Sequence, residues 1–166
     1  MLRKFSTVVL ILLCNIIQSC TPVAFDANQN LAARDNAALG LEYLKNGNKV
    51  RAKEKLLRAL HESPKSPAVL DAMAYYWEST GNIALASQYY EHAYQLAPND
   101  GAVLNNYGVF LCKQHHVQRA EILFLKAANL QNYINTAKAY ENAGVCALTV
   151  NDKAKAKDYF TKALAN

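Results

Sequence analysis

The sequence predicts an all-α fold built from four helix pairs, because residues of matching size recur along the chain at one spacing. Four sets of positions each repeat at intervals of 34, 34 and 36 residues. A period of this length indicates one supersecondary unit repeated four times. The small and large sets are Gly40, Ala74, Gly108, Gly144 and Leu56, Tyr90, Phe124, Phe160; the alanine sets are Ala52, Ala86, Ala120, Ala156 and Ala59, Ala93, Ala127, Ala163.

Small, small and large residues at fixed offsets form the tetratricopeptide pattern, in which each unit is a helix–turn–helix. Two antiparallel helices approach closely only where one presents Gly or Ala, and a large side chain of the other fills the space beside it. The array is therefore predicted to contain eight helices in a short right-handed superhelix with a concave inner face. The predicted units are 33–66, 67–100, 101–136 and 137–166.

Local signals place the helices of the first two units. The first helix is expected from Ala33 to Lys45, where Asn46 and Gly47 allow a left-handed C-cap. The second is expected to start after Asn48, a good N-cap, and to end before Pro64. In the second unit Ser66 is predicted to cap a helix that has proline in its first turn, where the missing N–H costs nothing. Thr80, Gly81 and Asn82 form the turn, and Pro98, Asn99 and Asp100 end the unit.

The last two units follow the same plan with one insertion. Gly101 opens the third unit, and the turns of the third and fourth units are predicted at residues 114–116 and 150–152. The two extra residues of the longer interval fall around residues 131–136, so we expect a longer loop there.

Residues 1–19 have the three parts of a secretory leader. Arg3 and Lys4 precede an apolar run that is too short to span a bilayer permanently. The string IIQSCT at residues 16–21 places Cys20 where a bacterial lipoprotein carries its acylated first residue. Thr21 favours the outer over the inner membrane, and residues 20–32 are expected to be a flexible tether. An ordinary secreted protein cut near Ser19 is the alternative.

The composition of the mature chain limits its expected partners and its cysteine chemistry. The sequence has 18 Lys and Arg against 13 Asp and Glu, and the basic residues are spread out, so nucleic acid is not an expected partner. Of the four cysteines, one leaves with the leader and Cys20 is acylated. Cys112 and Cys146 are then the only pair in an oxidising compartment, either bonded or as two buried thiols.

No pattern of residues predicts catalysis. His115 and His116 lie in a turn with no third metal ligand at helical spacing. The motifs of zinc proteases, serine hydrolases and phosphate-binding loops are missing from the sequence. We therefore expect a non-enzyme with no metal, no cofactor and no small-molecule substrate.

The concave face is the predicted binding site, for a protein segment with an apolar stripe. Asn105 is the sharpest candidate, because an amide facing the groove bonds a peptide backbone in both directions. A Lys and Asn clamp for a C-terminal carboxylate is not expected, since Ala37 and Leu41 occupy the corresponding positions. The predicted groove residues are Leu41, Leu44, Asp71, Tyr75, Glu78, Asn105, Val109, Lys113, Glu141 and Val145.

Behind such a leader, the segments LGLEYLKNGNKVRAKEKLLRAL (39–60), PNDGAVLNNYGVFLC (98–112) and AYENAGVCAL (139–148) resemble the type IV pilus biogenesis and stability lipoproteins of the PilF/PilW group. The resemblance covers residues 33–166 and implies a pilotin, an outer-membrane lipoprotein on the periplasmic face. A pilotin helps the pilus secretin reach that membrane and multimerise there. The resemblance and the oxidising periplasm together favour a Cys112–Cys146 disulfide. The alternative function is a general periplasmic adaptor for another envelope assembly.

Overall fold

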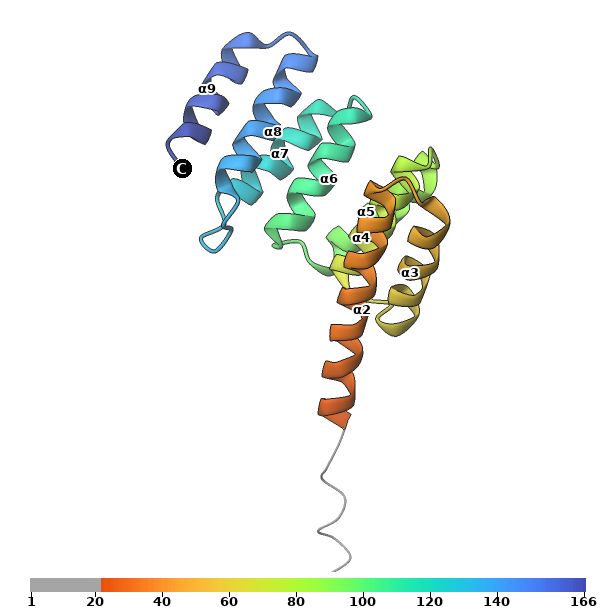
Figure 1. Ribbon diagram of the computed structural model, residues 1–166. Coiled ribbons are helices and arrows are strands. Elements are labelled where there is room, and N and C mark those ends of the chain that lie inside the picture. Colours follow the sequence, from red (N-terminus) through yellow and green to blue (C-terminus); the bar gives the residue numbers. More distant parts are fainter. Residues whose placement is uncertain (1–21) are drawn as a thin grey trace, which may run out of the picture.

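A computed structural model describes residues 22–166 of the chain, with side chains from residue 30 onward. Within that part all regular structure is helical, as the repeat predicted, and consecutive helices pair into four antiparallel hairpins (Figure 1). Cys20 and the predicted leader, residues 1–19, lie outside the described residues. The helices are α2 (Pro22–Lys45), α3 (Lys49–Glu62), α4 (Pro67–Ser79), α5 (Ile83–Leu96), α6 (Gly101–Lys113), α7 (Val117–Ala128), α8 (Thr136–Thr149) and α9 (Lys153–Leu164).

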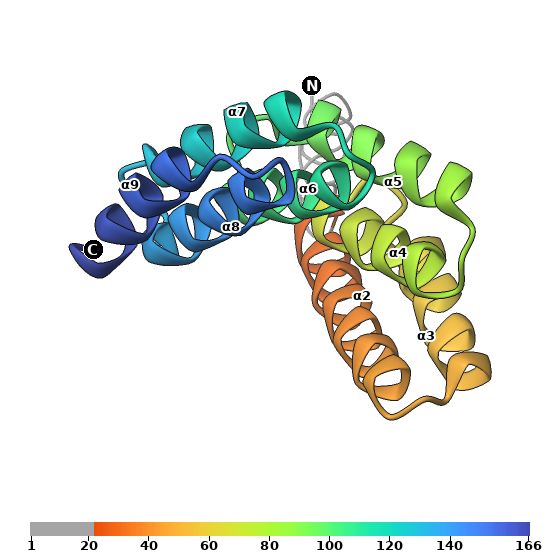
Figure 2. The same cartoon turned by 90° about the horizontal axis from the view of Figure 1, so that it is seen from above.

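The hairpins stack side by side into an arc, which Figure 2 shows from above. The first helices of neighbouring units pack against each other, α2 on α4, α4 on α6 and α6 on α8. The second helices α3, α5 and α7 instead pack on their own partners and on the first helix of the next unit, and α9 packs on α8. This arrangement gives the molecule an inner face formed by first helices. None of the described helices is both long enough and apolar enough to cross a membrane.

Glycine lets the two helices of a hairpin come together at the positions that the repeat predicts. A Cβ atom on Gly108 would lie 2.6 Å from the ring of Phe124, and one on Gly144 would lie 2.7 Å from the ring of Phe160. In the first unit, Gly40 stands in the same relation to Leu56. The size pattern in the sequence therefore records direct contacts between paired helices.

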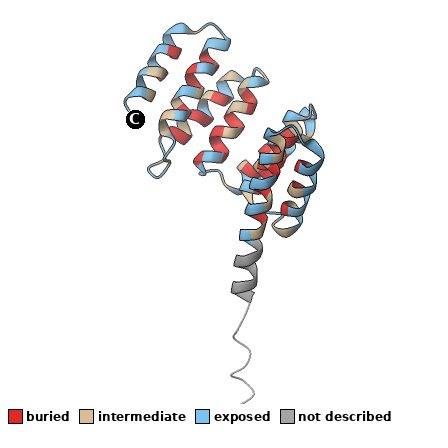
Figure 3. Cartoon of the chain, viewed as in Figure 1, coloured by how far each residue is buried: buried red, intermediate tan, exposed pale blue. Residues whose placement is uncertain are grey.

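The core runs between the inner and outer helices along the arc (Figure 3). At its centre, the ring of Tyr90 stacks on that of Tyr107 and lies 4.9 Å from that of Phe110. Trp77 packs at the boundary between units one and two, edge-on to Tyr76, and its indole N–H is buried without an acceptor among the described residues. Aromatic packing thus joins neighbouring units as well as paired helices.

Side-chain caps fix most of the second helices. The side-chain oxygens of Asn48, Asn82 and Asp152 each accept a hydrogen bond from the backbone N–H three residues on. Asp100 caps α6 in a similar way. The prediction for Ser66 is wrong in one respect: it is the N-cap residue of α4, but its side chain makes no cap hydrogen bond. Pro67 supplies the helical φ there instead.

The four turns within the hairpins need a left-handed residue at one shared position. Gly47 and Gly81 provide it at φ values of 77° and 87°. His115 and Asn151 occupy the same place in units three and four, at 64° and 60°. Left-handed backbone costs a residue with a side chain about 1–2 kcal/mol, and Asn tolerates it better than His. In units three and four the rest of the fold therefore offsets the cost of the left-handed backbone at His115 and Asn151.

The start of α2 differs from the prediction. Residues 22–32 were expected to be part of a flexible tether, but the helix begins at Pro22. This segment contains no glycine and no proline after the first position, and extending an existing helix costs little once the first turn has formed. The packed part that follows Ala33 therefore continues upstream as one helix.

Candidate functional site

An apolar groove lies on the inner face of the first three units, with a volume of about 560 Å³. Its walls come mainly from the first helices α2, α4 and α6, which the stacking of units places side by side. Its lining residues are Ala38, Leu41, Glu42, Lys45, Ala72, Tyr75, Glu78, Tyr90, Asn106, Val109 and Lys113.

An apolar strip crosses this face at one position of the repeat. Leu41, Tyr75, Val109 and Val145 are equivalent residues of the four first helices, spaced by 34, 34 and 36. The exposed fractions of Tyr75 and Val145 are 48% and 56%, which is high for large apolar residues of a folded chain. The strip therefore extends beyond the groove onto α8.

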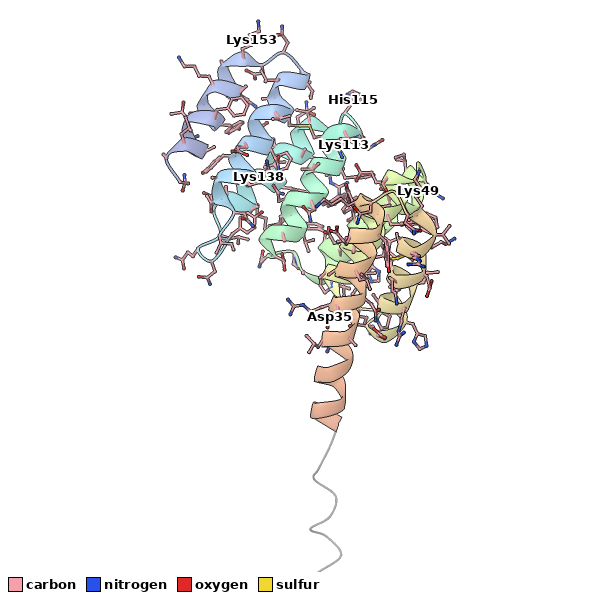
Figure 4. The ribbon with its side chains drawn as sticks, in the orientation of Figure 1. Asp35, Lys49, Lys113, His115, Lys138 and Lys153 are labelled. Carbon is pink, nitrogen blue, oxygen red and sulfur yellow. A yellow bond between two sulfur atoms is a disulfide. The ribbon has the colours of Figure 1, made fainter. Side chains whose placement is uncertain are left out.

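A polar cluster closes one end of the groove. Glu78 on α4 accepts hydrogen bonds from the Tyr90 hydroxyl at 2.9 Å and from the Lys113 ammonium at 2.7 Å. Figure 4 shows Lys113 near the end of α6. Burial and the neighbouring Glu78 raise the pKa of Tyr90, so this hydroxyl stays protonated and donates. The cluster ties α4, α5 and α6 together beside the apolar strip.

Asp71 lies behind the groove at the seam between α4 and α6. Its Oδ2 accepts a 2.7 Å hydrogen bond from Asn106, while its Oδ1 is buried without a partner among the described residues. Burial, together with Asp100 and Glu78, raises the pKa of this carboxyl to about 7, against the lowering effect of Asn106. An unpaired buried charge is costly, so Asp71 is held in the structure at an energetic cost.

The structure brings five of the predicted groove residues together in the groove, and they are Leu41, Tyr75, Glu78, Val109 and Lys113. Val145 and Glu141 lie exposed on α8, where Glu141 pairs with Lys138 at 3.0 Å. Figure 4 labels Lys138 on that helix. Leu44 is half-buried against the core of the first unit rather than part of the groove lining.

The placement of Asn105 in the groove is wrong. Asn105 is 8% exposed, and its Oδ1 accepts a 2.8 Å hydrogen bond from Asn142 at the seam between α6 and α8. The groove residue is its neighbour Asn106. One residue is a rotation of about 100° on a helix, enough to turn a side chain from a groove to a helix contact. In the sequence Asn106 follows Ala38 and Ala72 at the repeat spacing, but only the structure shows that this position lines the groove.

Cys112 and Cys146 form a disulfide that joins α6 to α8, with Cα atoms 5.8 Å apart. It lies near the strip, since Val145 precedes Cys146 on α8 and Val109 lies about one helical turn before Cys112 on α6. In the described part of the chain, no three His, Cys, Asp or Glu side chains gather in a way that could hold a metal ion.

Comparison with known proteins agrees with this architecture. The tetratricopeptide repeat family matches residues 71–100 and 137–165. A protein of Haemophilus influenzae, described as uncharacterized, is 36% identical over 124 residues, which are 75% of this chain and 69% of that protein. The type IV pilus assembly protein PilF of Pseudomonas aeruginosa is 33% identical over 143 residues, 86% of this chain.

Solved structures give the same relationship. The structure of Pseudomonas aeruginosa PilF superposes with a TM-score of 0.77 at 33% identity, covering 83% of this chain and 62% of PilF. PilW, a type IV pilus biogenesis factor, shares the fold with a TM-score of 0.75 at 23% identity, covering 80% of this chain and 61% of PilW. This chain spans 57% of the length of PilF in the sequence alignment. The chain belongs to the family of tetratricopeptide-repeat proteins of type IV pilus biogenesis that includes PilF.

Proposed function

We propose that this protein is a pilotin, a lipoprotein of the outer membrane that binds the secretin of the type IV pilus through its concave groove. In this role it promotes the localisation of the secretin to the outer membrane and its multimerisation there. The observation that carries the proposal is the exposed apolar strip on the inner face of a chain that is 33% identical to PilF.

The groove has the properties of a site for a protein segment. Exposed apolar area that follows one position of a repeat, bordered by charged side chains, is typical of a surface that a partner covers. Tyr75 stands at its centre, between Leu41 and Val109 of the neighbouring helices. Tyrosine is among the residues that contribute most to binding at protein interfaces.

The membrane anchor is proposed from the leader. Acylation of Cys20 would give the chain more than one acyl chain, and each buried methylene contributes about 0.8 kcal/mol, which makes the attachment stable. Thr21 after the cysteine supports the outer membrane as the destination. In this arrangement the repeats face the periplasm, where the soluble part of a secretin is accessible.

The groove is tested by replacing Tyr75 and Val109 together with alanine. We expect the purified periplasmic part of the cognate secretin to bind this variant at least tenfold more weakly in a titration, because two contacts at the centre of the strip are lost. The matched control is Ile122→Ala, which removes an exposed apolar side chain outside the groove. Equal weakening by the control, or undiminished binding by the double variant, would place the secretin elsewhere.

The anchor is tested by Cys20→Ser, expressed from the native gene. We expect the variant to lose its place in the outer-membrane fraction and secretin multimers to decrease, because the acyl acceptor is gone. Membrane fractionation and a heat-resistant multimer assay measure both effects. A variant that still fractionates with the outer membrane contradicts the lipoprotein assignment. If the wild-type protein is anchored normally but recovers no secretin in a pull-down, a general periplasmic adaptor is favoured.

A further inference from the structure

One polar contact occurs twice on the inner side of the array, at equivalent positions. The amide Nδ2 of Asn106 donates to Asp71 at 2.7 Å, and that of Asn142 donates to Asn105 at 2.8 Å. In each case the donor is on the first helix of one unit and the acceptor on the first helix of the preceding unit. The donors are 36 residues apart and the acceptors 34, as the repeat requires.

This contact fixes how each asparagine presents its amide. Because Nδ2 is bound to the preceding helix, the amide plane cannot rotate freely, and Oδ1 keeps one direction. Among the described residues, neither Oδ1 receives a hydrogen bond, and neither is among the fully buried atoms that lack a partner, so each keeps some contact with solvent. Asn106 lines the groove, and Asn142 lies on α8 between Glu141 of the predicted site and the strip residue Val145.

The first two units differ at this position. Ala38 and Ala72 stand where Asn106 and Asn142 stand in units three and four, and both alanines line the groove. At this position the inner face is therefore divided into a half with alanine side chains on α2 and α4 and a half with oriented amide acceptors on α6 and α8. The strip of Leu41, Tyr75, Val109 and Val145 runs through both halves.

From this division we infer that the groove binds its partner as an extended segment, with Asn106 and Asn142 accepting hydrogen bonds from the main-chain N–H groups of that segment. A bound helix has already used its main-chain donors internally, except in its first turn, whereas an extended segment has them free along its length. Amide acceptors in successive units suit donors that recur along an extended chain. Asp71 and Asn105 act as positioning residues, because they orient the two amides without contacting the segment.

The inference rests on the proposed function only for the source of the segment. The test therefore uses two sets of fluorescein-labelled peptides, one of overlapping peptides that cover the periplasmic part of the cognate secretin and one selected from a random display library on the wild-type protein. Binding is measured by anisotropy. Each bound peptide is then resynthesised with one N-methyl group at each position in turn, which removes a single main-chain donor.

We expect N-methylation at two separated positions to weaken binding about three- to tenfold each, as the loss of one hydrogen bond does. Asn106→Ala should weaken binding by a similar factor and abolish the effect of one of these N-methyl groups, and Asn142→Ala should abolish the effect of the other. Asp71→Ala should behave like Asn106→Ala. Asp71→Asn should restore both affinity and N-methyl sensitivity, because Asn105 already serves as such an acceptor for Asn142.

The outcomes separate the inference from the proposed function. N-methyl effects that persist unchanged in both asparagine variants, or no N-methyl effects at all, overturn the inference even where secretin peptides bind. Library peptides that show the expected coupling while no secretin peptide binds support the inference and contradict the secretin as partner. If no peptide from either set binds the groove, both are wrong. Asn106→Ala decides the matter even if Asp71→Ala fails to fold, since Asn106 is partly exposed.

Discussion

At the scale of single residues, the polar side chains behind the groove are held at an energetic cost, and Asp71 is the clearest case. Its carboxyl accepts from Asn106 on one oxygen only, and the other oxygen is buried without a partner among the described residues. Burial and two acidic neighbours favour its protonated form. The ionised form is therefore a local source of instability whose size depends on pH.

We predict that Asp71→Asn stabilises the protein at pH 8 but not at pH 4. The pKa of Asp71 is raised from an ordinary 3.8 to about 7 in the folded protein. Between these values the folded state binds the proton more tightly than the unfolded state, so this contribution to stability is present at low pH and is lost as pH rises toward 7. Removing the titration should raise the free energy of unfolding at pH 8 by roughly 1–3 kcal/mol.

Urea unfolding of both proteins at several pH values measures this effect. The difference between variant and wild type should grow between pH 4 and pH 7 and then level off. Asp35→Asn, which makes the same change at an exposed carboxyl in α2, is the matched control. A difference that is the same at every pH would mean that Asp71 titrates normally.

At the scale of helices, the repeat made the sequence unusually informative, and its failures have local causes. The turns, the paired Gly and aromatic positions and the start of each second helix were predictable, because they depend on residue type at a fixed spacing. The direction in which Asn105 points was not predictable, because the sequence gives no sign of which of two neighbouring polar residues faces another helix. The length of α2 was missed because polar composition without periodicity does not distinguish an extended helix from a tether.

Capping gives a prediction that separates two similar residues. Asn82→Ala should lower the free energy of unfolding by about 1 kcal/mol, since its side chain accepts from the N–H of Leu85 at the start of α5. Ser66→Ala should change it little, because the side chain of Ser66 makes no cap hydrogen bond on α4. Thermal unfolding followed by circular dichroism compares the two. A larger loss for Ser66→Ala would contradict the assignment of the caps.

At the scale of the whole molecule, stability in a repeat array is a sum over units and their contacts. The Cys112–Cys146 disulfide joins the last two units covalently, across the seam where Asn142 also meets Asn105. Cross-linking at a separation of 34 residues restricts the unfolded chain. The last two units are thus more firmly joined than the first two.

Replacing both cysteines with serine should lower the free energy of unfolding by roughly 3–4 kcal/mol on the chain-entropy account. Hydrogen exchange should locate the loss in α8 and α9, while α2 to α5 keep their protection, because each unit contacts only its neighbours. Wild-type protein treated with a reducing agent should reproduce the double variant. Uniform loss of protection along the chain would mean that the four units unfold as one.

The position of Trp77 provides a spectroscopic means to tell whether the units of the array unfold separately or as one. It is the single tryptophan of the chain, and its ring lies between the first two units, with the Lys53 ammonium 5.3 Å from the ring centre. Indole emission shifts to longer wavelength when water reaches the ring, so tryptophan emission reports on the surroundings of Trp77, in the amino-terminal half of the array. Circular dichroism averages over every helix. A gap between the two unfolding curves would therefore show how independently the half of the groove on α2 and α4 unfolds from the amide-bearing half on α6 and α8.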